Sequence, residues 1–183
     1  DCIKVLDLDG RLLYMNDGGQ VLMEIDDFDT VAQQPWAGFW QGSDRDRTTT
    51  ALNAALAGST GKFEGFCPTA KGTPKWWEVV VTPILDTSGQ VERILSVSRD
   101  ITDRQQAAVA LQASEELYRY TFARIPIGLA HVNLDGALFR VNQKFCEIVG
   151  YSEAELLNMT FRDFTEPADL PALLNKIHAP KKG

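Results

Sequence analysis

Apolar residues flank an Asp-Gly pair at two places in this chain of 183 residues. The stretch Leu8–Asn16 (LDGRLLYMN) returns 126 positions later as Leu134–Asn142 (LDGALFRVN), with Leu, Asp, Gly, Leu and Asn unchanged. Each copy predicts a β-hairpin, because Asp-Gly tolerates the positive φ of a tight turn. The Asn that ends each copy is suited to cap a following helix. Since solenoid repeats are only about 20 to 50 residues long, the repeat predicts one domain and the beginning of a second.

Within the first copy, the pattern changes from a hairpin to short helices and then to strands. Asp17-x-x-Gln20 and Ser43-x-x-Asp46 have the spacing of helix capping boxes, and Gly58 is suited to stop a helix. The predicted elements are strands 2–8 and 11–15, helices Asp17–Met23 and Thr48–Ala57, and strands 62–67, 75–84 and 91–101. The predicted fold class is therefore α+β, with a five-stranded antiparallel sheet and short helices inserted between its second and third strands.

A longer helix is predicted between the two copies. Residues 103–122 contain no Gly or Pro, and Thr102-x-x-Gln105 is a candidate capping box. Large residues recur every seven positions, with small or polar residues at the fourth heptad position: Leu111, Tyr118 and Ile125 with Ala107, Ser114 and Thr121. Such a seam predicts a weak parallel homodimer, because a few large side chains at ~1.5–3 kcal/mol each are set against an association cost of several kcal/mol. A plain spacer helix is the alternative.

The second copy shows further helix signals. Asn142 can start a helix that ends at Gly150, and Ser152-x-x-Glu155 and Thr160-x-x-Asp163 are capping boxes. A helix is also predicted at Asp169–Ile177. By the repeat offset, three closing strands would begin near residue 187, so we expect only the N-terminal part of a second module.

Several sequence motifs of this chain, taken together, resemble those of a PAS domain. The resemblance rests on the hairpin ending Tyr14-Met15-Asn16, Gly72-x-x-Lys75-Trp76-Trp77-Glu78-Val79, Thr82-Pro83-Ile84, Arg99-Asp100-Ile101-Thr102-Asp103-Arg104, Pro126-Ile127-Gly128-Leu129, and Asn142-x-x-Phe145-Cys146-x-Ile148-x-Gly150-Tyr151-Ser152-x-x-Glu155-Leu156. It implies a first PAS domain at 1–101, a linker helix at 102–122 and part of a second PAS domain at 123–183. It also implies sensory modules of the kind found upstream of bacterial histidine kinases and diguanylate cyclases. In that family the junction at Asp100 and Thr102 connects sensor to output, and we expect Leu111 and Tyr118 of the linker to pass the signal on. A solvated strand-end carboxylate is the alternative for Asp100.

Charge and composition exclude several partners. The net charge of −7 and pI of about 4.8 argue against a nucleic-acid or anionic lipid surface. No apolar run approaches the roughly 18 residues of a membrane span, and no signal peptide is recognisable. Three widely spaced cysteines, Cys2, Cys67 and Cys146, suggest neither a disulfide framework nor a metal knuckle. We therefore expect a cytoplasmic segment without membrane contact, whose parent protein could be membrane-anchored elsewhere.

A small-molecule pocket is predicted in the first module, where all four tryptophans lie. Strand alternation favours an inward face with Trp77, Val79 and Val81. The candidate pocket residues are Trp36, Phe39, Trp40, Phe63, Trp77 and Val79, although such aromatic residues also form ordinary cores. The ligand is unknown. A flavin adduct is disfavoured because the sequence contains no Asn-Cys-Arg-Phe motif. Haem is disfavoured because His131 and His178 lie outside the helix that supplies the axial ligand in haem PAS sensors.

Motifs of an enzyme are missing from the sequence. It has no Gly-rich phosphate loop, no Ser elbow, no HExxH and no phosphoacceptor His on a helix. We therefore expect no catalysis by this chain, and an output domain, kinase or cyclase, further along the parent protein. A dimerisation scaffold that binds no small molecule is the competing hypothesis.

Overall fold

The structure, a computed structural model, describes residues 1–170. It divides into two compact units, Asp1–Val109 and a second that begins at Ala110. The division falls inside one helix, α3 (Thr102–Arg124). This helix contains the residues of the linker predicted at 102–122.

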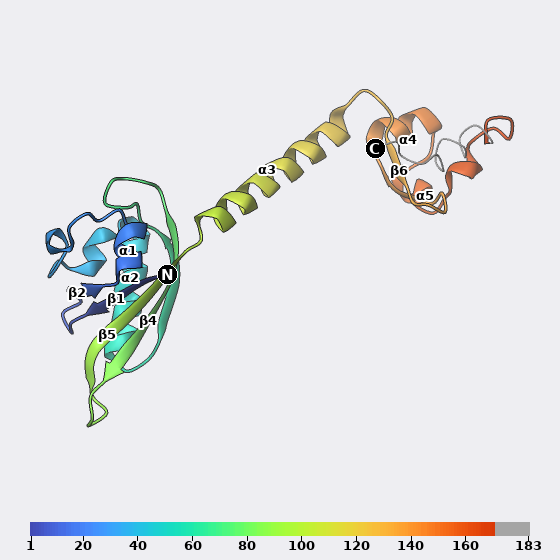
Figure 1. The fold of residues 1–183 in the computed structure, drawn as a ribbon. Helices are drawn as coiled ribbons and strands as arrows, with labels where there is room; N and C mark the ends of the chain where they lie inside the picture. Colours follow the sequence, from blue (N-terminus) through green and yellow to red (C-terminus); the bar gives the residue numbers. More distant parts are fainter. Residues whose placement is uncertain (171–183) are drawn as a thin grey trace. The chain divides into compact units, whose positions relative to one another are not determined.

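The first unit is built on a five-stranded antiparallel sheet, as the sequence predicts. The strands are β1 (Cys2–Leu6), β2 (Leu12–Met15), β3 (Gly61–Phe66), β4 (Trp76–Leu85) and β5 (Val91–Asp100), arranged in the order β2-β1-β5-β4-β3 (Figure 1). The two longest strands, β4 and β5, form the centre of the sheet with β1. In their register Trp77 pairs with Asp100 and Val81 with Ser96. The end of β5 therefore lies directly beside the start of β4.

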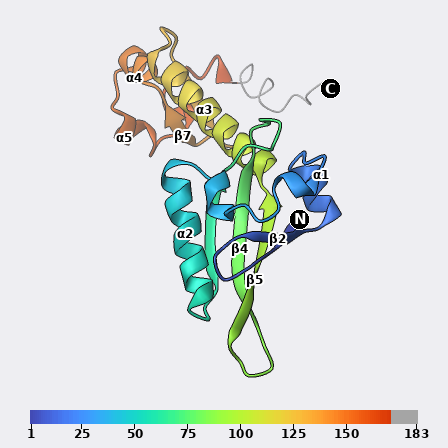
Figure 2. The same cartoon turned by 90° about the vertical axis from the view of Figure 1, so that its left-hand side faces the viewer.

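Helices occupy the connection between β2 and β3. They are α1 (Asp17–Leu22), 3-10 turns at Phe28–Thr30 and Trp36–Phe39, and α2 (Gly42–Leu56). Figure 2 shows α2 lying along the sheet. Gly61 permits this close packing, because a Cβ there would lie 2.5 Å from the Cα of Ala51.

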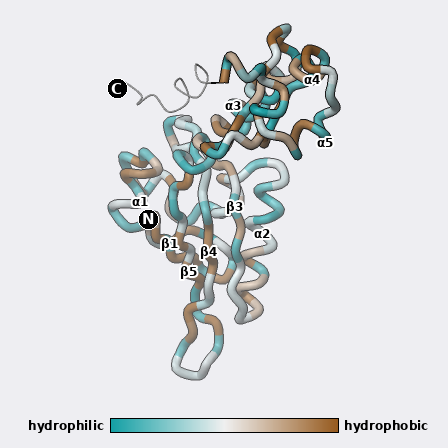
Figure 3. Tube along the Cα trace, turned by 90° about the vertical axis from the view of Figure 1, so that its right-hand side faces the viewer, coloured by the Kyte–Doolittle hydropathy of each residue, from teal (hydrophilic) through white to brown (hydrophobic). Residues whose placement is uncertain are grey.

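The core of this unit lies between the helices and one face of the sheet. Trp77, Val79 and Val81 are all at most 1% exposed, which confirms the predicted inward face of β4. Apolar segments of β1, β4 and β5 lie next to one another in the sheet (Figure 3). On β1, however, the buried face is Cys2, Lys4 and Leu6, while Ile3 is exposed. A lysine thus faces the core.

The first unit differs from the prediction in several details. Strand β1 ends at Leu6, because the Asp7 carboxylate accepts hydrogen bonds from Asp9 N and Arg11 N and forms the turn in which Gly10 has φ +74°. The Asp17 capping box is wrong: the side chain of Asn16 caps α1, accepting from Gly19 N at 3.1 Å.

The Ser43 capping box is also wrong. Helix α2 begins earlier, at Gly42, after Gln41, which makes no side-chain cap. The Asp44 carboxylate in its first turn accepts a hydrogen bond from Phe66 N of β3 at 3.1 Å. The start of α2 is therefore determined by its contact with the sheet, which cannot be predicted from a local capping motif.

The second unit begins with the hairpin of β6 (Ala130–Val132) and β7 (Leu138–Val141). Its helices are α4 (Gln143–Val149) and α5 (Glu153–Leu156), with a 3-10 turn at Phe161–Asp163. The four predicted helix signals are confirmed: Asn142 caps α4, Gly150 ends it with φ +81°, and both capping boxes form. The predicted helix Asp169–Ile177 lies outside the described residues except for its first two positions, and His178 lies outside them as well.

Candidate functional site

A cavity of about 260 Å³ lies in the first unit, between the sheet and the segments that connect β2 to α2. Its walls are mostly apolar and come from β1, β2, β4, β5, the chain between α1 and α2, and the β3–β4 loop (Cys67–Lys75). The lining residues are Lys4, Met15, Met23, Ile25, Val31, Trp36, Phe39, Trp40, Cys67, Pro68, Thr69, Ala70, Trp77 and Ser98. An apolar cavity with a few polar groups is typical of a small-molecule site.

Four of the six predicted pocket residues line this cavity: Trp36, Phe39, Trp40 and Trp77. The rings of Trp36 and Trp40 meet edge to face, with centroids 6.1 Å apart. The other two predicted residues lie behind the wall. Phe63 packs edge-on against Trp40 at 5.1 Å, and Val79 is fully buried in the core.

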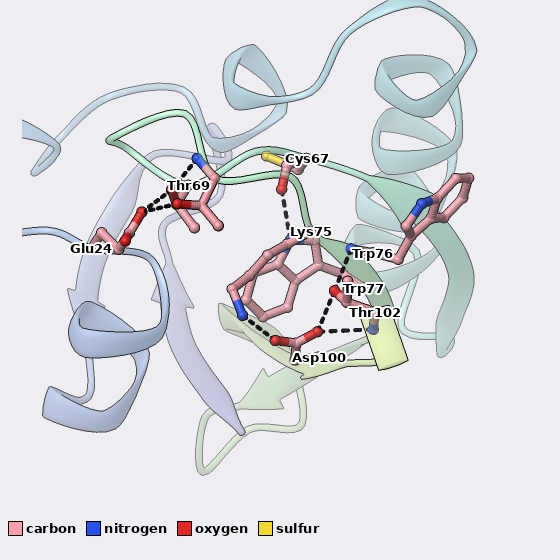
Figure 4. Close-up of polar contacts among 9 residues, drawn as sticks. Glu24, Cys67, Thr69, Lys75, Trp76, Trp77, Asp100 and Thr102 are labelled. Carbon is pink, nitrogen blue, oxygen red and sulfur yellow. Dashed lines mark hydrogen bonds and ion pairs between the residues drawn. The ribbon is translucent and has the colours of Figure 1, made fainter. Parts of the chain in front are cut away.

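Hydrogen bonds fix the orientation of the Trp77 wall. The Nε1 of Trp77 donates to the carbonyl oxygen of Cys67 at 2.9 Å (Figure 4). The Cys67 thiol in turn donates to the carbonyl oxygen of Phe39 at 3.2 Å. Burial raises the pKa of Cys67 to about 11, although the nearby Lys4 ammonium favours the thiolate. Cys67 is thus a protonated, structural thiol at neutral pH.

Two residues that line the cavity carry polar groups whose hydrogen-bonding capacity is not filled within the described residues. Lys4 is 4% exposed, and its Nζ donates to Ser98 Oγ at 3.0 Å but forms no ion pair there. Its Nζ also lies 5.9 Å from the centroid of the Trp36 ring. The Nε1 of Trp40 is buried without a hydrogen-bond acceptor among these residues. Both groups are donors.

Sequence reasoning missed Lys4 and the loop residues of the cavity. In Cys2-Ile3-Lys4-Val5-Leu6, the apolar pair Ile3 and Val5 makes Lys4 look outward-facing. The structure turns the other face inward. In the sequence, the apolar residues Cys2 and Leu6 lie on the same face of the strand as Lys4. Alternation alone therefore does not decide which face of β1 is buried.

A second group of contacts joins the β3–β4 loop to the chain that follows α1. Glu24 accepts hydrogen bonds from the hydroxyls of Thr69 and Thr73, the latter at 2.7 Å (Figure 4). Ala70 N donates to Met23 O at 2.9 Å, and Lys71 pairs with Asp26 at 2.8 Å. The hydrogen bonds from Thr69 and Thr73 lower the pKa of Glu24 below its ordinary value. Because both segments line the cavity, these contacts hold one side of its wall together.

The junction of β5 and α3 is a compact polar cluster. Asp100 forms an ion pair with Lys75 and accepts from the backbone N and the hydroxyl of Thr102, at 2.9 and 2.6 Å. The Thr102 hydroxyl accepts from Trp76 N at 3.1 Å (Figure 4). Partial burial disfavours the Asp100 carboxylate, but the hydrogen bonds from Lys75 and Thr102 outweigh it and lower the pKa of Asp100.

The predicted Thr102-x-x-Gln105 capping box does not form. The Thr102 hydroxyl is engaged by Asp100 and Trp76, and the Gln105 side chain donates to Glu64 of β3 at 3.1 Å. Arg104 pairs with the same Glu64 at 2.6 Å. The first turn of α3 is therefore attached to the strands of the first unit through side chains, with Asp100 taking the capping role that the sequence assigned to Thr102.

The two predicted linker residues are exposed along α3. Leu111 is 62% exposed and Tyr118 is 40% exposed. Tyr118 stacks on Phe122 at 5.8 Å, and the Arg140 guanidinium lies 4.8 Å from its ring centroid. In the part of the chain that the structure describes, no group of three His, Cys, Asp or Glu side chains could hold a metal ion. Within residues 1–170 no helix is long and apolar enough to span a membrane.

Replacing Glu24 should loosen the β3–β4 loop without unfolding the domain. In Glu24→Ala the hydroxyls of Thr69 and Thr73 lose their acceptor, so amide hydrogens of residues 69–73 should exchange roughly tenfold faster. Hydrogen exchange followed by mass spectrometry measures this, with Asp26→Ala, which removes only the exposed Lys71 pair, as the matched control. Equal exchange in the two variants would show that Glu24 does not hold the loop.

Comparison with known proteins agrees with this architecture. A family model described as PAS fold matches residues 1–106, and one described as PAS domain matches residues 126–182. An RNA-binding light-oxygen-voltage receptor of known structure has a TM-score of 0.54 at 19% identity, over 63% of this chain and 33% of that chain. That likeness concerns the fold.

Two relatives are similar in sequence. Biofilm dispersion protein BdlA of Pseudomonas aeruginosa is 28% identical over 107 residues, which are 57% of this chain and 24% of that protein. Probable diguanylate cyclase DgcE of Escherichia coli K12 is 33% identical over 67 residues, 37% of this chain and 6% of that protein. The chain thus matches a quarter or less of either relative's length. It belongs to the PAS family of sensory domains, with two PAS domains in tandem.

Proposed function

We propose that the first PAS domain binds a small molecule in the cavity beside Trp77 and passes a conformational change through Asp100 and Thr102 into α3. From α3 the signal reaches an output domain of the parent protein. A histidine kinase is our first candidate for that domain. The name of the DgcE relative supports a diguanylate cyclase as the second candidate.

The observation that supports this proposal most directly is the pairing of Trp77 with Asp100 in the β4–β5 register. Trp77 is a wall of the cavity, and Asp100 holds the start of α3. Lys75 connects the two a second time, since its Nζ pairs with Asp100 and lies 6.0 Å from the centroid of the Trp77 ring. A ligand that shifts Trp77 would therefore displace the groups that anchor the helix.

Exposed apolar residues favour a role of α3 in dimerisation. Leu111, on the seam, and Leu117, beside it, are each more than 60% exposed in the single chain. Pairing along the Leu111–Tyr118 seam would cover part of this surface. A homodimer whose helices pair weakly suits a switch, because a ligand can redistribute only states that differ by a few kcal/mol.

Binding itself is tested with a set of small molecules of up to about ten non-hydrogen atoms. We expect at least one to quench tryptophan fluorescence and to appear as an added mass in native mass spectrometry, since three tryptophans line the cavity. The variant Val31→Trp, which fills the cavity, should lose this binding. If the unaltered protein binds none of these molecules and dimerises in their absence, the dimerisation scaffold becomes the better description.

Asp100→Ala should separate binding from signalling. Removing the carboxylate leaves Lys75 and the Thr102 N–H without their partner, so amides of the first turn of α3 should exchange at least about tenfold faster. Ligand binding should persist, but its effect on α3 should disappear. Asp103→Ala, on the same turn, is the control. Unchanged exchange and unchanged coupling in Asp100→Ala would refute the role of this residue.

Dimerisation is tested on the heptad seam. Leu111→Glu places a charge at the seam and should weaken self-association at least about tenfold. Ala113→Glu adds the same charge two positions away, off the seam, and should leave association unchanged. Sedimentation velocity over a range of concentrations measures both. A monomeric unaltered protein, or equal effects of the two variants, would make α3 a spacer helix.

A further inference from the structure

We propose that the ligand of the first PAS domain is a small organic monoanion, an apolar body ending in a carboxylate that pairs with Lys4. This inference rests on the ligand-binding function proposed above and assigns its chemical class. It begins from a lysine whose side chain is 4% exposed and lines the cavity.

A buried ammonium without a counter-ion is costly. Lysines are almost never fully buried unless they are paired, and desolvating the charge is unfavourable by several kcal/mol. An ammonium has three N–H donors, and within residues 1–170 Lys4 uses one of them, on Ser98 Oγ. The face of Trp36, 5.9 Å away, compensates only part of the cost. A ligand carboxylate would supply both the missing charge and the missing acceptor.

The other groups at the cavity agree with an anion. Ser98 also lines the cavity and offers a hydroxyl next to the ammonium. Among residues 1–170, no carboxylate lines the cavity. The lining therefore contains one positive charge and no negative one, which favours a single negative charge on the ligand.

The remaining walls determine the body of the ligand. Met15, Val31, Trp36 and Trp77 present apolar and aromatic surface, which suits a hydrocarbon chain or ring. An engineered cavity of about 150 Å³ binds benzene, so by simple scaling a cavity of about 260 Å³ takes about ten non-hydrogen atoms. Aryl-acetic and short aliphatic monocarboxylic acids have this size.

The test compares two acids with their neutral isosteres: phenylacetate with phenylacetamide, and hexanoate with hexanamide. Binding is measured by isothermal titration calorimetry and tryptophan fluorescence. For at least one pair we expect the acid to bind at least about tenfold more tightly than the amide. In Lys4→Met, which keeps the side-chain length, this preference should vanish while amide binding remains. Lys62→Met removes an exposed lysine from β3 and should leave the preference unchanged.

Each other outcome contradicts the inference in a recognisable way. Equal affinity for acid and amide, or an acid preference that survives in Lys4→Met, would overturn the pairing with Lys4 but leave a ligand-binding domain. If none of the four compounds binds, the monoanion is overturned, and the broader set of small molecules decides separately whether the cavity binds a ligand. Loss of folding does not confuse the result, because replacing an unpaired buried charge by Met should keep or raise the melting temperature, which is measured alongside.

Discussion

The antiparallel pairing of β4 with β5 is the constraint on which the rest of the first domain depends. It places Trp77 beside Asp100, so the wall of the cavity and the anchor of α3 are neighbours in one ladder. Because a register shift of one residue would turn every side chain to the opposite face, this pairing cannot drift while Val79 and Val81 stay buried. The wall of the cavity and the start of α3 are therefore joined through the core of the sheet, and the polar contacts of Asp100 complete that connection.

The cavity follows from the same sheet. Interiors are normally packed to crystal-like density, so an internal space of about 260 Å³ needs a structural cause. Here the segments opposite the strands are short 3-10 turns and loops, which cannot fill the space over the sheet as α2 does. Large rings at Trp36, Trp40 and Trp77 form its walls, and hydrogen bonds through Cys67 and Glu24 hold the β3–β4 loop against neighbouring segments.

The sequence predicted the fold class, the strand order along the chain and the inward face of β4, since these depend on periodicity and turn residues. It also predicted the four helix signals of the second domain, where the caps are local. The prediction of helix starts was wrong where a side chain near the start binds a distant strand. Asp44 accepts a hydrogen bond from β3, and Thr102 accepts one from Trp76. The starts of α2 and α3 therefore do not follow the capping motifs. The cavity was predicted in part, through its tryptophans. Lys4 was missed because alternation in β1 fits either face, and only pairing with β5 decides which one is buried.

Energetic balance connects these features. An ammonium at Lys4 with no counter-ion among residues 1–170 costs stability, and the proposed seam along α3 would bury few large side chains. A ligand that pairs with the ammonium gains interaction energy in the one conformation where its charge reaches Lys4, and this differential affinity is what moves a population. A helix pair with one deep minimum would resist such a bias. Leu111 is the only large aliphatic side chain of the predicted seam within α3, so the proposed pairing would bury little apolar surface. In the proposed dimer, a weak seam is therefore one that the differential affinity of a ligand could bias.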